Sequence, residues 1–141
     1  MYTIITRNNS MDIAKQYIRA FSGSAWDVSD VENRILEYIN HPLFRGYVKT
    51  ENNEIICAAF GILQQYYDGL RYFLTDLFTS PNYQNQGHAS ALLDYMKEQL
   101  RGENVKQIML ISLDDDLHNH FYNDKNGFST RNELCIKRFV L

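Results

Sequence analysis

The feature that most constrains this chain is a strand-like run that passes through a short polar turn directly into a helix, between Leu70 and Leu100. The run before the turn is rich in aromatic and apolar residues, and Pro81 ends it. After the turn, apolar residues recur at helical spacing at Ala89, Leu92, Leu93, Met96 and Leu100. Phosphate-binding turns are built from a strand, a tight turn and a helix in this order.

The turn itself, Gln84–Ala89, has the sequence QNQGHA. Gly87 and Ala89 carry almost no side chain, so a ligand can come close to the backbone N–H groups of the first helical turn. Those N–H groups have no partner within the helix and lie at the positive end of the helix dipole. The turn therefore predicts a site for a diphosphate.

Two motifs in this half of the chain resemble the GNAT family of acetyltransferases. Gln84, Gly87 and Ala89 match that family's acyl-CoA-binding pattern Q/R-x-x-G-x-G/A, between a strand carrying DLFTSP and an amphipathic helix. Further along, Phe121–Phe128 resembles the F-Y-x-x-x-G-F segment that closes the same cofactor site. The resemblance covers roughly the second half of the chain, and the first half matches it only in the order of its elements.

Length and composition agree with one globular domain over residues 1–141. The net charge of −3, with Lys and Arg scattered, gives no basic stripe of the kind that nucleic-acid binding requires. No apolar run is long enough to span a membrane and no signal-peptide pattern is present, so we expect a cytoplasmic protein. Cys57 and Cys135 lie in apolar strand-like runs and are predicted to be small buried hydrophobes.

Taken in order, the chain predicts a strand over 2–6, a helix from Met11 that residues 22–25 end, and a second helix to about Asn40 behind a capping box at 29–32. The next predicted elements are strands over 44–50, 55–66 and 70–79, the motif helix, a strand over 107–113, a short helix over 116–125 and a last strand over 134–141. This is the element order of the acyl-CoA N-acyltransferase fold. The resemblance implies an α+β protein in three α/β/α layers, with a mixed, mostly antiparallel sheet whose central parallel strands splay apart.

In the family, the pantetheine arm of acetyl-CoA, the co-substrate, lies between these two splayed strands. The resemblance implies backbone contacts to pantetheine and diphosphate from the end of the strand, the turn and the first helical turn. The residues at these positions are Leu77, Phe78, Thr79, Gln84, Asn85, Gln86, Gly87, His88, Ala89 and Ser90. His88 is also explained as a variable position that faces solvent.

The implied reaction is direct transfer of an acetyl group from acetyl-CoA to a primary amine. By resemblance, Tyr122 is the general acid that protonates the departing thiolate, and a backbone N–H near Phe78 stabilises the thioester oxygen. A core aromatic is the alternative interpretation of Tyr122. Asp76 is the candidate for amine deprotonation, because a carboxylate among apolar strand residues needs a partner or a chemical task. A purely structural Asp76, with water molecules taking the proton, is the alternative.

The segment before Tyr122 departs from the family pattern. Where many members have Asn and Ala, this chain has Asp115 and His118, so the pantetheine contact at Asp115 is expected to differ. The carboxylates and imidazoles of residues 114–120 do not predict a metal site, since His118 and His120 point to different faces of a helix and the loop lacks a calcium-loop glycine.

The amine acceptor is not specified by any motif. In this fold the first two helices and their loop wall the acceptor side, so Trp26 and Tyr38 are candidates for acceptor contacts through their ring faces. Small-molecule N-acetylation is the first hypothesis, with protein or peptide N-acetylation and non-catalytic acyl-CoA binding as alternatives. The apolar C-terminal run Cys135–Leu141 could pair with a second copy in a homodimer.

Overall fold

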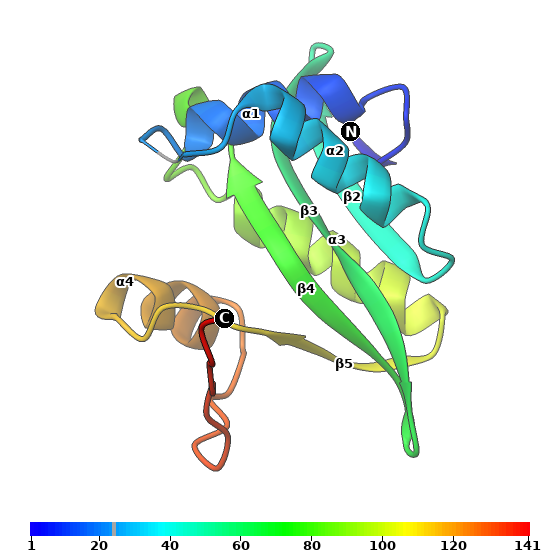
Figure 1. Ribbon diagram of the computed structural model, residues 1–141, viewed down its shortest axis with the longest axis vertical. Coiled ribbons are helices and arrows are strands. Elements are labelled where there is room, and N and C mark those ends of the chain that lie inside the picture. Colours follow the sequence, from blue (N-terminus) through cyan, green and yellow to red (C-terminus); the bar gives the residue numbers. More distant parts are fainter. Residues whose placement is uncertain (24) are drawn as a thin grey trace. The chain divides into compact units, whose positions relative to one another are not determined.

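A computed structural model describes residues 1–23 and 25–141. It divides into two compact units, Met1–Ile111 and Ser112–Leu141, each of which is described by itself. Ser24, which falls in the predicted break between the first two helices, lies outside the described residues. Figure 1 shows the elements and their labels.

The first unit begins with strand β1 (Tyr2–Ile4) and helices α1 (Ser10–Ala20) and α2 (Val28–Ile39). The capping box predicted at 29–32 is wrong. The helix begins earlier, because Asp27 is the N-cap and its side chain accepts a 2.8 Å hydrogen bond from the Asp30 N–H. Ile13 and Ala14 of α1 and Val31 and Ile35 of α2 are buried, as the helical spacing of apolar residues requires.

Three long strands follow, β2 (Phe44–Glu51), β3 (Glu54–Tyr66) and β4 (Gly69–Thr79), and they confirm the predicted strands. The turn between β2 and β3 places Asn52 and Asn53 at positive φ, 50° and 65°, which asparagine tolerates well. Gly69, at φ 125°, makes the next turn. Both connections are short enough to keep neighbouring strands antiparallel.

A short 3-10 helix, η1 (Pro81–Tyr83), leads from β4 to helix α3 (His88–Gly102), and β5 (Val105–Leu110) completes the unit. The described part of the chain forms a five-stranded sheet in the order β1-β2-β3-β4-β5, with only the β4–β5 pair parallel. Strand β5 begins two residues before the predicted strand over 107–113 and ends three residues before it, so Ile111–Leu113 lie outside the strand. This sheet is mixed and mostly antiparallel, as predicted.

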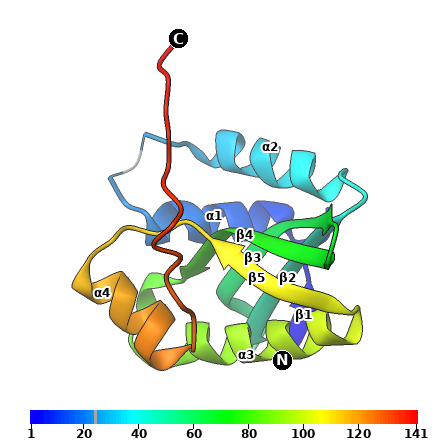
Figure 2. The same cartoon turned by 90° about the horizontal axis from the view of Figure 1, so that it is seen from below.

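The sheet of the first unit lies between two helical layers. Helices α1 and α2 cover one face and α3 covers the other, as the turned view of Figure 2 shows. Under α1 and α2 the core is a cluster of buried residues from both helices and from β2, β3 and β4, with Phe60 and Phe78 as its large rings. Leu92, Leu93, Met96 and Leu100 are the buried side of α3.

The second unit holds helix α4 (Asp116–Asn119), which continues into a π-helical segment, η2 (His120–Lys125). The predicted strand over 134–141 is wrong, since the structure assigns no strand to these residues. Cys135 is exposed, so its prediction as a buried residue is also wrong, whereas Cys57 is buried as expected. Apolar composition alone indicated this strand, and no partner strand satisfies its backbone within Ser112–Leu141.

No helix among residues 1–23 and 25–141 is long and apolar enough to cross a membrane.

Candidate active site

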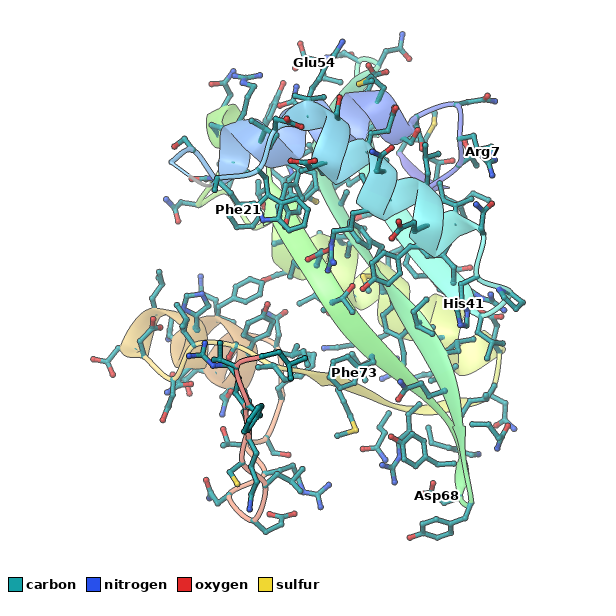
Figure 3. All side chains as sticks on the ribbon, viewed as in Figure 1. Arg7, Phe21, His41, Glu54, Asp68 and Phe73 are labelled. Atoms are coloured by element: carbon teal, nitrogen blue, oxygen red, sulfur yellow. The ribbon has the colours of Figure 1, made fainter. Side chains whose placement is uncertain are left out.

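The parallel strands β4 and β5 separate part of the way along the sheet. Their pairing runs from Leu70 and Val105 to Leu74 and Leu110 and stops there. Thr75–Thr79 continue to pair with β3 on their other side. Figure 3 labels Asp68 in the turn that precedes β4 and Phe73 just before the separation. Because backbone groups in an antiparallel strand alternate between its two edges, half of the N–H and C=O groups of Thr75–Thr79 face away from β3, toward the opening.

A β-bulge in β4 coincides with this separation. Phe60 pairs with Asp76 but the next residue, Gly61, pairs with Leu74, so Thr75 is the extra residue. The Thr75 hydroxyl donates a 3.0 Å hydrogen bond to the Phe60 carbonyl. Bulges bend the strand that carries them and increase its twist. We attribute the departure of β4 from β5 to this bend.

Helix α3 follows β4 and η1 in the chain, and Gly87 is its N-cap with φ 83°. No side chain caps the helix, and its first intrahelical bond joins the Ala91 N–H to the Gly87 carbonyl at 3.0 Å. The N–H groups of His88 and Ala89 therefore precede the first helical bond. A Cβ built on Gly87 would meet no atom within 4 Å, so the space above this turn is open. The helix terminus suits an anionic ligand.

The polar side chains of the turn hold its shape. Gln84 donates from Nε2 to the Thr79 carbonyl at 3.2 Å, and Gln86 donates to the Asn82 carbonyl at 3.3 Å. Asn85 has φ 61°, in the left-handed region that Asn visits more readily than most residues. These contacts tie the turn to the end of β4, so Leu77, Phe78, Thr79 and the turn form one continuous edge.

His88 is half-buried, and its ring has two neighbours. Its Nδ1 lies 2.8 Å from Lys49 Nζ on β2, and its ring meets the Tyr83 ring edge-on at 5.9 Å. A lysine ammonium can only donate, so His88 Nδ1 accepts in this contact. The sequence alone did not indicate Lys49, which is thirty-nine positions away and on another element. Together they place a cation beside the start of α3.

Asp76 is mostly buried, with 11% of its side chain exposed, and its carboxylate pairs with Arg34 of α2 at 3.0 Å between Oδ2 and Nε. Burial raises the pKa of Asp76 above its ordinary value, and the hydrogen bond and charge of Arg34 oppose that rise. The residue that was predicted to need a partner or a task thus has a partner within its own unit. Its role in proton transfer remains a prediction.

The Arg34 guanidinium also lies against both rings that were predicted to contact the acceptor. Its Cζ is 5.0 Å from the centre of the Tyr38 ring and 5.9 Å from that of Trp26. Both distances are within the range of cation–π attraction. Arg34 was not predicted from the sequence, although its spacing of four residues from Tyr38 on a predicted helix was a usable signal. Trp26, Arg34, Tyr38 and Asp76 form one cluster, which we call the cation cluster.

Tyr122 lies in the second unit, in the π-helical segment. Its ring meets Phe121 edge-on at 4.9 Å and Phe128 at 5.5 Å, and the Phe128 N–H bonds to its carbonyl at 3.0 Å. Burial raises the pKa of Tyr122 above its ordinary value, so the phenol keeps its proton at neutral pH. A protonated phenol can donate, which is the state that a general acid needs. Its role as acid stays a prediction.

Asp115 caps the helix that precedes Tyr122. Its Oδ1 accepts from the His118 N–H at 2.8 Å and lies 2.7 Å from His118 Nδ1. These hydrogen bonds lower the pKa of Asp115, first through the backbone N–H and then through the ring. Asp115 therefore has a capping task, and its contact with acetyl-CoA stays a prediction. No group of three or more potential metal ligands gathers among the described residues.

Acetyl-CoA fits what the first unit presents. The pantetheine arm carries amides that can pair with the open edge of Thr75–Thr79, and the diphosphate suits the uncapped start of α3 beside Lys49. The open space at Gly87 would allow phosphate oxygens to reach the backbone. The contacts of each residue with the co-substrate remain predictions.

Solved structures with the same fold are numerous. An aminoglycoside acetyltransferase from an uncultured soil metagenomic sample, in complex with sisomicin, has a TM-score of 0.83 and 14% identity over 100% of this chain and 95% of that one. The aminoglycoside N-acetyltransferase AAC(6')-Iy in complex with CoA has a TM-score of 0.81 and 10% identity, over 99% and 93%. A predicted acetyltransferase from Clostridium acetobutylicum with acetyl-CoA has a TM-score of 0.74 and 21% identity, over 98% and 95%. At these identities the likeness shows the fold.

No curated protein matches the chain in sequence. Residues 11–128, in contrast, match the sequence profile of the Acetyltransferase (GNAT) family. This match spans most of the chain and contains both motifs, the splayed strands and the start of α3. The chain therefore belongs to the GNAT family of acetyltransferases.

Proposed function

We propose that this GNAT acetyltransferase moves the acetyl group of its co-substrate, acetyl-CoA, to a primary amine of a small molecule by direct attack. The observation that carries the proposal is the open edge of Thr75–Thr79, which runs into the uncapped start of α3 and has Asp76 within it. Acetyl-CoA supplies the activated acetyl group. The chain's own residues bind it, orient it and move protons.

In the proposed reaction the amine nitrogen bonds to the acetyl carbon and the carbon–sulfur bond breaks. Asp76 accepts the proton that the protonated amine must lose, directly or through water. Tyr122 donates its phenolic proton to the departing sulfur. A backbone N–H near Phe78 stabilises the charge on the carbonyl oxygen, in line with the family resemblance. The side chains named here as catalytic are Asp76 and Tyr122.

Three features support a small cationic amine as the acceptor. The cation cluster joins a buried carboxylate to two aromatic rings, which is a combination that attracts ammonium groups. The net charge of −3 also suits a cationic substrate. Two of the structures with the same fold are described as aminoglycoside acetyltransferases, one of them with sisomicin bound.

The experiment is an acceptor screen with purified protein and acetyl-CoA. Panels of polyamines, aminoglycosides, amino acids and short peptides are compared by release of the free CoA thiol, and products are identified by mass spectrometry. The proposal predicts thiol release with small amines and a mass increase of one acetyl group. Turnover with peptides alone would point to a protein acceptor. Acetyl-CoA binding without turnover of any amine would contradict catalysis and favour a binding module.

A further inference from the structure

The cation cluster is a complete cation site that the chain fills with its own side chain. The Asp76 carboxylate accepts a 3.0 Å hydrogen bond from Nε at the edge of the Arg34 guanidinium, and the Tyr38 and Trp26 rings lie 5.0 and 5.9 Å from its central carbon. A carboxylate with two aromatic rings is the set of groups that binds an alkylammonium ion. Arg34 therefore occupies the place that a cationic ligand would take.

Arg34 is held in a way that permits exchange. Its side chain is 31% exposed, and it contacts Asp76 through one hydrogen bond from Nε, rather than through a bidentate pair. Water and salt can reach the Arg34 side of the pair and compete for the guanidinium, which weakens its hold on Asp76. Asp76 itself is 11% exposed, so a neighbouring cation is needed to stabilise its charged carboxylate.

We propose that the acceptor's ammonium group binds in the cation cluster by displacing Arg34. This inference rests on the proposed function and deepens it by naming the charge class of the acceptor. Arg34 is a stand-in cation that keeps Asp76 neutralised until the acceptor arrives. An aliphatic amine, protonated in water, can replace a guanidinium here, whereas an uncharged arylamine cannot.

The displacement also orders the events at the site. The ammonium ion first pairs with Asp76 and packs between the two rings. It then gives its proton to Asp76, and the neutral nitrogen is free to attack the acetyl carbon. Recognition of the acceptor as a cation and its activation as a nucleophile would thus use the same carboxylate.

The test uses Trp26, the chain's single tryptophan, as a reporter within the site. Spermidine is titrated, without acetyl-CoA, into wild-type protein, Arg34→Met and Arg34→Gln, and the change in tryptophan fluorescence gives each Kd. Arg19→Met is the matched control, because it removes one positive charge from the exposed side of α1, where Arg19 contacts Gln16. Circular dichroism checks that each variant is folded.

Removing the competing cation is expected to tighten spermidine binding about three- to tenfold in both Arg34 variants, as the loss of a weak internal competitor should. Arg19→Met should bind as the wild type does. Adding Asp76→Asn to Arg34→Met should abolish the gain, because the carboxylate is the attraction. Unchanged or weaker binding in both Arg34 variants would overturn the displacement and make Arg34 a positioning residue for Asp76.

Thiol release separates this inference from the proposed function. Turnover of amines by the wild type, with no tightening in the Arg34 variants, would overturn the displacement and leave N-acetylation standing. Tighter binding in the variants, with no turnover of any amine by the wild type, would support the cation site and count against small-amine acetylation.

Discussion

Two opposing effects set the pKa of Asp76. Burial disfavours its charged form, while Arg34 favours it through a hydrogen bond and through its charge. The titratable groups that share this neighbourhood are Arg34, Tyr17, Tyr38 and Tyr72. In the proposed reaction Asp76 must be ionised to accept a proton, so this balance would set the pH at which N-acetylation begins.

Arg34→Met should move the acid limb of the kcat/KM profile to higher pH. Without Arg34, only the effect of burial remains, the pKa of Asp76 rises, and a higher pH is needed to ionise it. The measurement is kcat/KM against pH with the best acceptor from the screen, and Arg19→Met serves as the control. A limb that stays in place or moves to lower pH would show that Asp76 is not the group that titrates.

At this scale the sequence indicated that Asp76 matters but could not indicate that Arg34 is its partner. Burial of Asp76 followed from its apolar neighbours, which are local in sequence. The Arg34–Asp76 pair joins residues forty-two positions apart, and only the packing of α2 against the sheet brings them together. The contact of His88 with Lys49 was missed for the same reason.

At the scale of elements, the bulge in β4 connects the sheet to the site. Strands β2, β3 and β4 were predicted from their composition, and their bounds differ from the structure by at most one residue. The bulge was not predictable in the same way, because alternation of side chains continues on either side of Thr75. It depends on Gly61, where a Cβ would lie 2.0 Å from the Phe73 carbonyl oxygen.

Gly61→Ala should destabilise the fold. The added Cβ meets backbone rather than a flexible side chain, so β3 and β4 must move apart, at a cost of about 1–3 kcal/mol in the free energy of unfolding. Urea denaturation measures it. Gly102→Ala is the control, since a Cβ there meets nothing within 4 Å, and an unfolding midpoint for Gly61→Ala equal to that of the control would contradict the close approach.

Gly87→Ala should weaken acetyl-CoA binding. Gly87 has φ 83°, a conformation that costs an alanine about 1–2 kcal/mol, and the new Cβ would project into the open space above the turn. Calorimetric titration with acetyl-CoA is expected to show a higher Kd for Gly87→Ala than for Gly102→Ala. Equal affinities in the two variants would mean that the diphosphate does not approach this backbone.

At the scale of the whole molecule, the chain was predicted to be one domain over residues 1–141, and that remains a proposal. The structure has two compact units that meet in sequence between Ile111 and Ser112. The predicted homodimer also remains a proposal. The argument for a homodimer is weaker than expected, because it relied on a C-terminal strand over residues 134–141 that the structure does not contain.

One domain should unfold in a single transition seen equally from both units. Trp26 reports on the first unit, and a fluorophore on the exposed Cys135 reports on the second. Cys57 should stay unlabelled, because burial raises its pKa to about 12 and keeps it from reacting as a thiolate. Coincident urea transitions are expected, and separate midpoints for the two reporters would show two domains.

The most direct test of the account is CoA thiol release by the wild type and Tyr122→Phe, with the best amine of the screen and saturating acetyl-CoA. Loss of the phenolic proton should lower kcat by about 100- to 10,000-fold, which is the usual contribution of a general acid, with acetyl-CoA affinity nearly unchanged. Near-wild-type kcat in Tyr122→Phe would contradict the assigned proton donor. No thiol release from the wild type with any amine, despite acetyl-CoA binding, would contradict the proposed reaction itself.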